Sequence, residues 1–170
     1  MTRYEGIRLA LPASGTASGQ HAAVAEIAFG PLTELAGFML RLAQLEIFAS
    51  FFRDFGASGI TPGQIGILVA ISRNPGARQG VLADALHIKW SNMAKIVRLL
   101  EDQKLVERRV PENDRRAVEL HLTGGGRAVV DQLVPQLAVS DRAATTTLTQ
   151  RERETLLRLL AKLTGVERAR

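Results

Sequence analysis

The stretch LADALHIKWSNMAKIVRLLEDQKLVERR, residues 82–109, decides the fold. Its apolar residues recur at the helical spacing i, i+3, i+4, i+7, which predicts an amphipathic helix from Trp90 to Asp102 with its core face made by Met93, Ile96, Val97 and Leu100. A shorter helix is predicted from about Arg78 to Leu86, and only His87, Ile88 and Lys89 separate the two helices. Two helices joined by so short a link predict a helix-turn-helix.

Beyond this pair the sequence changes from helical to strand spacing. Apolar residues alternate over 105–110 and again over 118–122, and a turn of sequence PENDRRA, residues 111–117, lies between them. The pattern predicts a β-hairpin with a charged tip. Four arginines lie along it: Arg108, Arg109, Arg115 and Arg116. A helix-turn-helix followed by a basic hairpin is a winged helix. We interpret the glycines Gly124 to Gly126 as a hinge between the wing and the next helix.

Predicted helices flank this central part on both sides. On the N-terminal side, one long amphipathic helix is predicted from Pro31 to near Gly56, and a second begins at the capping box Thr61–Gln64 and ends near Asn74. On the C-terminal side, one helix is predicted from about Arg127 to Thr146, and the last opens at a second capping box, Thr149–Glu152. The predicted fold class is therefore mainly α with a small β-hairpin.

The composition narrows the classes of function. The chain of 170 residues has no cysteine, which excludes disulfides, thiolate metal sites and cysteine nucleophiles. His21, His87 and His121 lack the spacing of metal ligands, and there is no nucleophile elbow or phosphate-binding loop. We therefore expect no enzyme activity, no metal and no cofactor. The longest apolar stretch is too short to cross a bilayer and the first residues lack the pattern of a signal peptide, so a cytoplasmic protein is expected.

Charge is concentrated in the middle of the chain. The net charge is +5, and 18 of the 22 basic residues are arginines. Residues 73–127 carry eleven basic and seven acidic side chains, whereas residues 1–60 carry four and five. Such an excess suits an acidic polymer as partner, although a solvated basic face would show the same excess.

The predicted helix from Trp90 has a polar face that suits a major groove. Ser91, Asn92, Lys95, Arg98 and Asp102 lie opposite its apolar face. Their hydrogen-bond donors and cationic groups can contact phosphates and guanine, and the side-chain amide of Asn92 can contact adenine. Any amphipathic surface helix, however, also has a polar face. An arginine at the end of an extended arm suits a minor groove, and we expect Asp114 to orient Arg116 through a salt bridge. These features predict DNA binding; the alternative is a winged-helix module that binds proteins without specific DNA affinity.

These stretches resemble the MarR family of winged-helix transcription regulators over about residues 31–165. The most specific element is the pattern in which Asp114 and Arg116 precede the alternating Val118, Leu120 and Leu122, then Thr123 and a glycine. The resemblance implies contacts to the major groove or its phosphates from Gln79, Lys89, Trp90, Ser91, Asn92 and Lys95. It also implies that Arg116 enters the minor groove beside Arg115 and is held there by Asp114.

The resemblance further implies an assembly and a mode of regulation. Members of the family are typically homodimers on short palindromes, so we expect a repressor that binds double-stranded DNA and is released by a small anionic ligand. The corresponding division of the chain is a flexible arm (1–30), a dimerisation helix (31–60), a winged helix-turn-helix lobe (61–123) and C-terminal dimerisation helices (124–170).

Several positions depart from the family pattern. His87 replaces the usual glycine in the turn, and Gln103 and Lys104 replace a usual glycine before the first wing strand. A left-handed backbone at His87 would be strained. Lys89 stands at the N-cap, where lysine cannot accept the free N–H groups of the helix. Trp90 either packs against the sugar-phosphate backbone or fills a gap beneath the helix.

A ligand cleft, if there is one, is expected between the long first helix and the DNA-binding lobe. Phe48, Phe51 and Phe52 cluster there with Phe55, and Arg41 or Arg53 could hold an aromatic carboxylate or its coenzyme A thioester. The alternative is that these phenylalanines belong only to the core and the dimer interface, since buried aromatic rings usually just pack.

Overall fold

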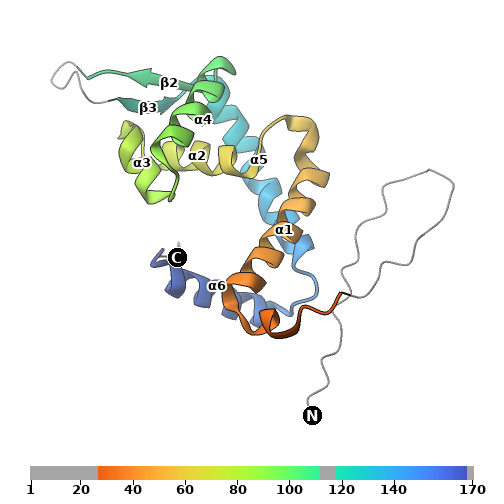
Figure 1. Cartoon of the computed structure of the whole chain (residues 1–170). Helices are drawn as coiled ribbons and strands as arrows, with labels where there is room; N and C mark the ends of the chain where they lie inside the picture. The colour runs from red at the N-terminus through yellow and green to blue at the C-terminus, as the bar shows by residue number, and fades with distance from the viewer. Residues whose placement is uncertain (1–26, 112–117, 168–170) are drawn as a thin grey trace, which may run out of the picture. The chain divides into compact units, whose positions relative to one another are not determined.

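The computed structural model describes residues 27–111 and 118–167, so most of the predicted arm, residues 1–26, lies outside the described residues. The chain divides into two compact units, residues 1–45 and 46–170. The elements, labelled in Figure 1, are the 3-10 helix η1 (Gly30–Glu34), α1 (Ala36–Phe55), the 3-10 helix η2 (Gly56–Ser58), α2 (Pro62–Arg73), β1 (Ala77–Arg78), α3 (Gln79–Ala85), α4 (Trp90–Asp102), β2 (Val106–Arg109), β3 (Glu119–Leu122), α5 (Gly124–Ala144) and α6 (Gln150–Thr164).

The described part of the first unit is η1 and the first half of α1. The predicted start of the long helix at Pro31 is wrong, because Pro31 lies in the 3-10 turn and Leu35 is extended (φ −94°, ψ 114°) before α1 begins at Ala36. The rings of Phe29 and Phe38 pack against each other with centroids 5.2 Å apart. No side chain is buried among residues 27–45, and the exposed apolar ones include Leu32, Leu35, Met39, Leu40 and Leu45.

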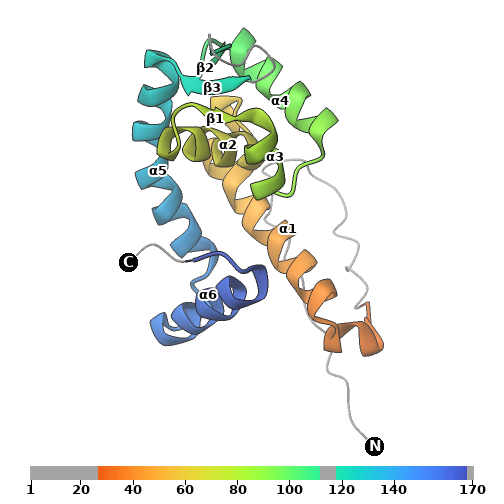
Figure 2. The same ribbon diagram turned by 90° about the vertical axis from the view of Figure 1, so that its left-hand side faces the viewer.

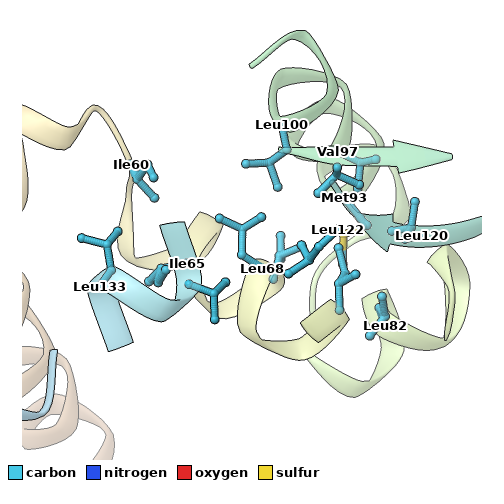
Figure 3. Packing of buried hydrophobic residues seen from close by; sticks show 14 of the residues in the cluster. Ile60, Ile65, Leu68, Leu82, Met93, Val97, Leu100, Leu120, Leu122 and Leu133 are labelled. Atoms are coloured by element: carbon cyan, nitrogen blue, oxygen red, sulfur yellow. The ribbon is translucent and has the colours of Figure 1, made fainter. Parts of the chain in front are cut away.

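The second unit has one hydrophobic core, built around α2. The predicted capping box is confirmed: Thr61 Oγ1 accepts from the Gln64 N–H at 3.3 Å, and Gln64 Oε1 accepts from the Thr61 N–H at 2.7 Å. Side chains from α2, α4 and β3 point toward one another in Figure 3, and the buried apolar ones are Ile65, Ile67, Leu68, Ile71, Met93, Val97, Leu100, Leu120 and Leu122. This core fixes α4 relative to the hairpin.

The sheet has one more strand than the sequence predicts. The hairpin is confirmed, with Val106 opposite Leu122 and Arg109 opposite Glu119, but β1 also pairs with β3, so that the antiparallel order is β1-β3-β2. Figure 2 shows β1 beside β3. A strand of two residues has no periodicity to detect, and it is held by backbone hydrogen bonds from Gly76 N to Leu120 O and from Gln79 N to Val118 O, both 3.1 Å.

Left-handed residues flank α4 at both ends. His87 has φ 52° in the turn before α4, and Lys104 has φ 58° just after it. Both are positions where the MarR-like pattern has a glycine, so the strain anticipated at His87 is confirmed and Lys104 shares it. This conformation raises the free energy of a residue with a Cβ by about 1 kcal/mol or more, because the Cβ crowds the following carbonyl oxygen.

We therefore expect His87→Gly and Lys104→Gly each to raise the free energy of unfolding by about 0.5–1 kcal/mol, after the larger unfolded-state entropy of glycine is subtracted. Urea denaturation followed by circular dichroism measures the change. Lys104→Ala is the matched control, since alanine keeps the Cβ and should bring no gain. A glycine variant no more stable than the original chain would show that the left-handed backbone at that position costs nothing.

The interpretation of the triple glycine as a hinge is wrong. Gly124 to Gly126 form the first turn of α5, and Thr123 caps it by accepting a hydrogen bond from Gly126 N at 3.0 Å. The Thr123 hydroxyl also donates to Lys104 O at 2.6 Å, which ties this turn to the segment between α4 and β2. A Cβ built on Gly126 would lie 2.0 Å from Leu105 O, so the third glycine is needed for close backbone approach.

The last helix begins at the predicted capping box. The Thr149 hydroxyl and then the Thr149 backbone N–H donate to the Glu152 carboxylate, at 2.7 and 2.8 Å, and together they lower the pKa of Glu152. A lowered carboxyl pKa stabilises the fold above the ordinary pKa of glutamate and ceases to do so as the pH falls through the folded-state pKa. No residue of α6 is buried, and its exposed apolar side chains are Leu156, Leu159 and Leu163, with Val166 just beyond it.

Candidate functional site

The polar face of α4 is fully exposed in the structure. The helix has the predicted bounds, Trp90–Asp102, and Met93, Val97 and Leu100 are completely buried against the core. Among the predicted contact residues, the structure brings together on the exposed side Lys89, Trp90, Ser91, Asn92, Lys95 and Arg98. The separation of faces predicted from the sequence is therefore confirmed, and α4 lies next to the hairpin in Figure 1.

The N-terminal end of α4 is electropositive for three reasons. Lys89 occupies the N-cap position, and its side chain makes no capping hydrogen bond, as expected for a lysine. The first turn contains no acidic residue, so the partial positive charge of the helix dipole is not neutralised there. Lys95 adds a second lysine charge six residues further on, in the second turn of the helix. The acidic residues of the helix, Glu101 and Asp102, lie at its opposite end.

Trp90 lies on the surface and does not fill a gap beneath α4. Its side chain is 59% exposed at the first position of the helix. The edge of the indole rests over α3, because a Cβ built on Gly80 would be 3.7 Å from Trp90 Cζ3. The alternative of a buried structural role is therefore wrong for the chain as described.

Gln79 does not share the exposed surface of α4. It is the first residue of α3 and is only 4% exposed. Its backbone N–H is also taken, by Val118 O. A side chain buried in this way cannot reach a phosphate without rearrangement, and the reason is the pairing of β1 with β3, which draws the start of α3 against the sheet. We therefore leave Gln79 out of the proposed contact surface.

The described part of the wing anchors its arginines to carboxylates. Arg108 pairs with Glu101 of α4 at 3.3 Å, which links β2 to α4. Arg109 donates from Nε to Glu107 on the same strand at 3.0 Å. These two arginines are thus engaged within the protein. The residues assigned to the wing tip, Asp114, Arg115 and Arg116, lie outside the described residues, and so does the expected salt bridge between Asp114 and Arg116.

A cavity of about 200 Å³ lies between the end of α1, the start of α2 and the second half of α5. Its lining is mostly apolar: Ile47, Phe48, Phe51, Pro62, Ile65, Leu137 and Ala144, with Ser140 and Asp141 as the polar members. A cavity of about 150 Å³ is known to hold a benzene molecule, so one substituted ring fits here by volume.

The structure brings only part of the predicted ligand set to this cavity. Phe48 and Phe51 line it, whereas Phe52 is 49% exposed and does not. Arg53 also lies outside the lining and donates to Ser50 Oγ at 3.0 Å. Arg41 belongs to the first unit, residues 1–45. The helical spacing of α5 could have pointed to Leu137, Ser140 and Ala144 on one face, but nothing local in the sequence pairs that face with α1.

Both polar residues of the cavity are hydrogen-bonded to neighbouring helices. The Ser140 hydroxyl donates to Asp54 Oδ2 at the end of α1, at 2.5 Å. Asp141 accepts from Arg153 of α6, also at 2.5 Å, and the Nε of this arginine is buried with no hydrogen-bond acceptor. The cavity wall therefore carries the Ser140 hydroxyl and the Asp141 carboxylate, which is paired with Arg153, and none of the described residues that line it is a cation.

Over residues 27–111 and 118–167, no group of three or more histidine or acidic side chains is arranged to hold a metal ion. No single helix within these ranges is long and apolar enough to cross a membrane; only Ala36–Ser58 and Pro62–Arg73, taken together as a sharply bent pair, reach that length and composition.

The short α3, the tight turn, the exposed α4 and the hairpin paired with β1 define a winged helix-turn-helix. Residues 58–117 match the model of the MarR family. The chain is 34% identical over 141 residues, 82% of its length and 85% of the relative's, to the putative transcriptional regulatory protein for the hcr operon of Thauera aromatica. The chain belongs to the MarR family and is a transcription regulator.

Solved structures agree in fold over most of the chain. The transcriptional repressor CouR bound to a 23-mer DNA duplex has a TM-score of 0.74 and 33% identity, with 82% of this chain and 99% of that chain covered. CouR bound to p-coumaroyl-CoA has a TM-score of 0.72 and 31% identity, with 81% and 97% covered. The same fold thus occurs in complexes with a DNA duplex and with an aromatic acyl thioester.

Proposed function

We propose that the chain is a homodimeric repressor that binds a palindromic operator and acts in the cytoplasm. Each protomer places α4 in a major groove, with contacts from Lys89, Trp90, Ser91, Asn92, Lys95 and Arg98. The wing tip, with Arg115 and Arg116 oriented by Asp114, enters the flanking minor groove. The observation that carries the proposal is the exposed, cationic and uncapped start of α4 in a chain whose fold matches CouR on DNA.

The proposed dimer uses the apolar surface that the monomer leaves uncovered. The exposed leucines of α6 are Leu156, Leu159 and Leu163, Val166 is exposed just beyond the helix, and further exposed apolar residues lie over 27–45. Surfaces of this kind mark protein interfaces, since a monomer gains nothing from exposing them. We therefore assign dimerisation to residues 31–60 and 124–170, and the two α4 helices would read half-sites about one helical turn apart.

The experiment that tests this function is selection of bound fragments from random or genomic DNA with the full chain, followed by titration of the selected sequence at two salt concentrations. We expect a palindrome bound far above background, with an affinity that falls steeply as salt rises, because bound phosphates release counterions. Only weak, sequence-independent binding would contradict a specific regulator and favour a protein-interaction module.

For the effector we propose a coenzyme A thioester of a small aromatic acid. The cavity admits one ring by volume, but a free carboxylate inside it would meet the Asp141 carboxylate, whose partner Arg153 is already engaged, and none of the described residues that line the cavity is a cation. Burial of an unpaired carboxylate is costly. A thioester carries no charge on its acyl group, and the coenzyme with its phosphates would remain outside the cavity. The complex of CouR with p-coumaroyl-CoA supports this class of ligand.

Filling the cavity should separate regulation from DNA binding. Ala144 lines the cavity, so Ala144→Leu occupies part of the space that the acyl group requires. We expect aromatic acyl-CoA to release the operator from the original chain and to need at least about tenfold higher concentration with this variant, a loss of about 1.4 kcal/mol in binding. Fluorescence anisotropy of labelled operator measures release.

The matched control is Ala143→Leu, which places the same side chain on the neighbouring, exposed position of α5. It should respond to acyl-CoA like the original chain, and both variants should bind operator with unchanged affinity when no ligand is present. Release of the Ala144→Leu variant at the original ligand concentration would place the effector somewhere other than this cavity.

A further inference from the structure

Trp90 is an apolar exception on the proposed contact surface. It is the only tryptophan of the chain and stands at the first position of α4, among the polar and cationic residues Lys89, Ser91 and Asn92. More than half of its side chain is exposed, and Val81 on α3, the residue after Gly80, is 60% exposed. An exposed aromatic ring beside an exposed valine indicates a contact with an apolar group of a partner.

The ring is bordered by α3 on one side before any partner binds. The edge of the indole lies beside Gly80, where a Cβ would be 3.7 Å from Cζ3, an ordinary contact distance. Tryptophan has only two side-chain torsions, so its large ring loses little entropy on binding. Trp90 is therefore suited to a specific contact.

The chemistry of the major groove restricts what such a ring can contact. Among the base edges there, the thymine C5-methyl group is the one apolar feature, whereas the other groups are hydrogen-bond donors and acceptors. Phosphates can be contacted by the cationic Lys89 and Lys95, whereas the indole has no charge and could offer a phosphate only its single Nε1–H. The first residues of a recognition helix are those that reach base edges.

We propose that Trp90 reads a thymine by contact with its C5-methyl group, at one position in each half-site of the operator. This inference rests on the proposed function, because it requires α4 to enter the major groove. Trp90 is then a residue that determines sequence specificity, in addition to the hydrogen-bonding residues Ser91 and Asn92.

The test uses deoxyuridine, which differs from thymidine only by the absence of this methyl group. In the operator obtained by selection, symmetry-related thymines are replaced pair by pair, and the affinity of the full-length dimer is measured for each duplex. At one pair we expect a loss of about fourfold per half-site, or about fifteenfold for the palindrome, the value of one buried methyl group at each site. Trp90→Ala should bind the thymine and deoxyuridine duplexes equally well.

Two controls separate this contact from a general loss of packing. Leu99→Ala removes another exposed apolar side chain of α4, 53% exposed and more than two turns further on, and it should keep the full difference between thymine and deoxyuridine. Because Trp90 is the only tryptophan, its fluorescence reports on the site directly, and operator binding should protect it from quenching by acrylamide.

The outcomes distinguish the inference from the function on which it rests. If the original chain binds no duplex above background, the proposed function is wrong and the inference fails with it. If the chain binds its operator but no thymine pair shows a deoxyuridine effect that Trp90→Ala abolishes, the function stands and the inference alone is wrong. If Trp90→Ala weakens binding to the thymine and the deoxyuridine duplex by the same factor relative to the original chain, Trp90 contacts the sugar-phosphate backbone and not the methyl group.

Discussion

Replacing Gly126 by alanine is expected to lower the free energy of unfolding by about 3 kcal/mol, the upper part of the usual range for overpacking. The new Cβ would lie 2.0 Å from Leu105 O and 3.0 Å from the Leu105 carbonyl carbon. Both are backbone atoms, so no rotamer change relieves the clash and α5 must move away from the start of β2. Guanidinium denaturation followed by circular dichroism measures the loss.

Gly124 provides the matched control for this prediction, two residues earlier in the same turn. A Cβ built there has no heavy atom within 4 Å, so Gly124→Ala adds a better helix former without any clash. We expect unchanged or slightly raised stability, by up to about 0.5 kcal/mol, given the lower helix propensity of glycine. Equal destabilisation by both alanines would mean that glycine flexibility, and not close packing, is required in this turn.

The contrast between these glycines shows where sequence analysis reaches its limit. Three consecutive glycines indicate a flexible backbone, and the local sequence alone therefore predicts a hinge. The requirement at Gly126 comes from Leu105, which is remote in sequence and becomes its neighbour only when the hairpin closes. The two capping boxes, by contrast, lie within four residues each, and both were predicted correctly at Thr61 and Thr149.

The same distinction applies to the candidate site. The exposed face of α4 was predicted because helical spacing alone separates Met93 and Val97 from Ser91 and Lys95. The burial of Gln79 was not predicted, since it depends on the two-residue strand β1 and its partner β3. The cavity that we propose for the ligand has Phe48 and Phe51 of the predicted set on its α1 side, whereas the α5 residues opposite them are about ninety positions away in the chain and were not predicted.

The family pattern points to the positions with a left-handed backbone, which hydrophobic periodicity cannot do. Positions 87 and 104, where this chain lacks the usual glycine of the family, are the two non-glycine positions among the described residues with a left-handed backbone, φ 52° and 58°. Hydrophobic spacing carries no information on the sign of φ, whereas the usual glycine of the family marks it. The strain in this chain lies at the two ends of α4, the helix that we propose for DNA recognition.

Lys95→Ala is expected to weaken operator binding by about tenfold per half-site, and so by about a hundredfold for a dimer that occupies both half-sites. Lys95 lies on the exposed side of α4, one turn beyond its electropositive start, in the position to contact a phosphate. Its side chain faces away from the core, so the variant should keep its helix content and its dimerisation. Anisotropy titration of labelled operator measures the affinity, and sedimentation measures the assembly.

The salt dependence of binding identifies the kind of contact that is lost. Each lysine that neutralises a phosphate contributes about one unit to the slope of log K against log salt, so the slope should fall by about two units for the dimer. The loss should also be similar for operator and random DNA, because phosphates carry no sequence information. Lys162→Ala removes the same charge from the exposed last turn of α6 and should change neither affinity nor slope by more than a small factor. Undiminished binding by Lys95→Ala would contradict the assignment of this face of α4 to the major groove, while equal losses from both variants would show that only the overall charge of the chain matters.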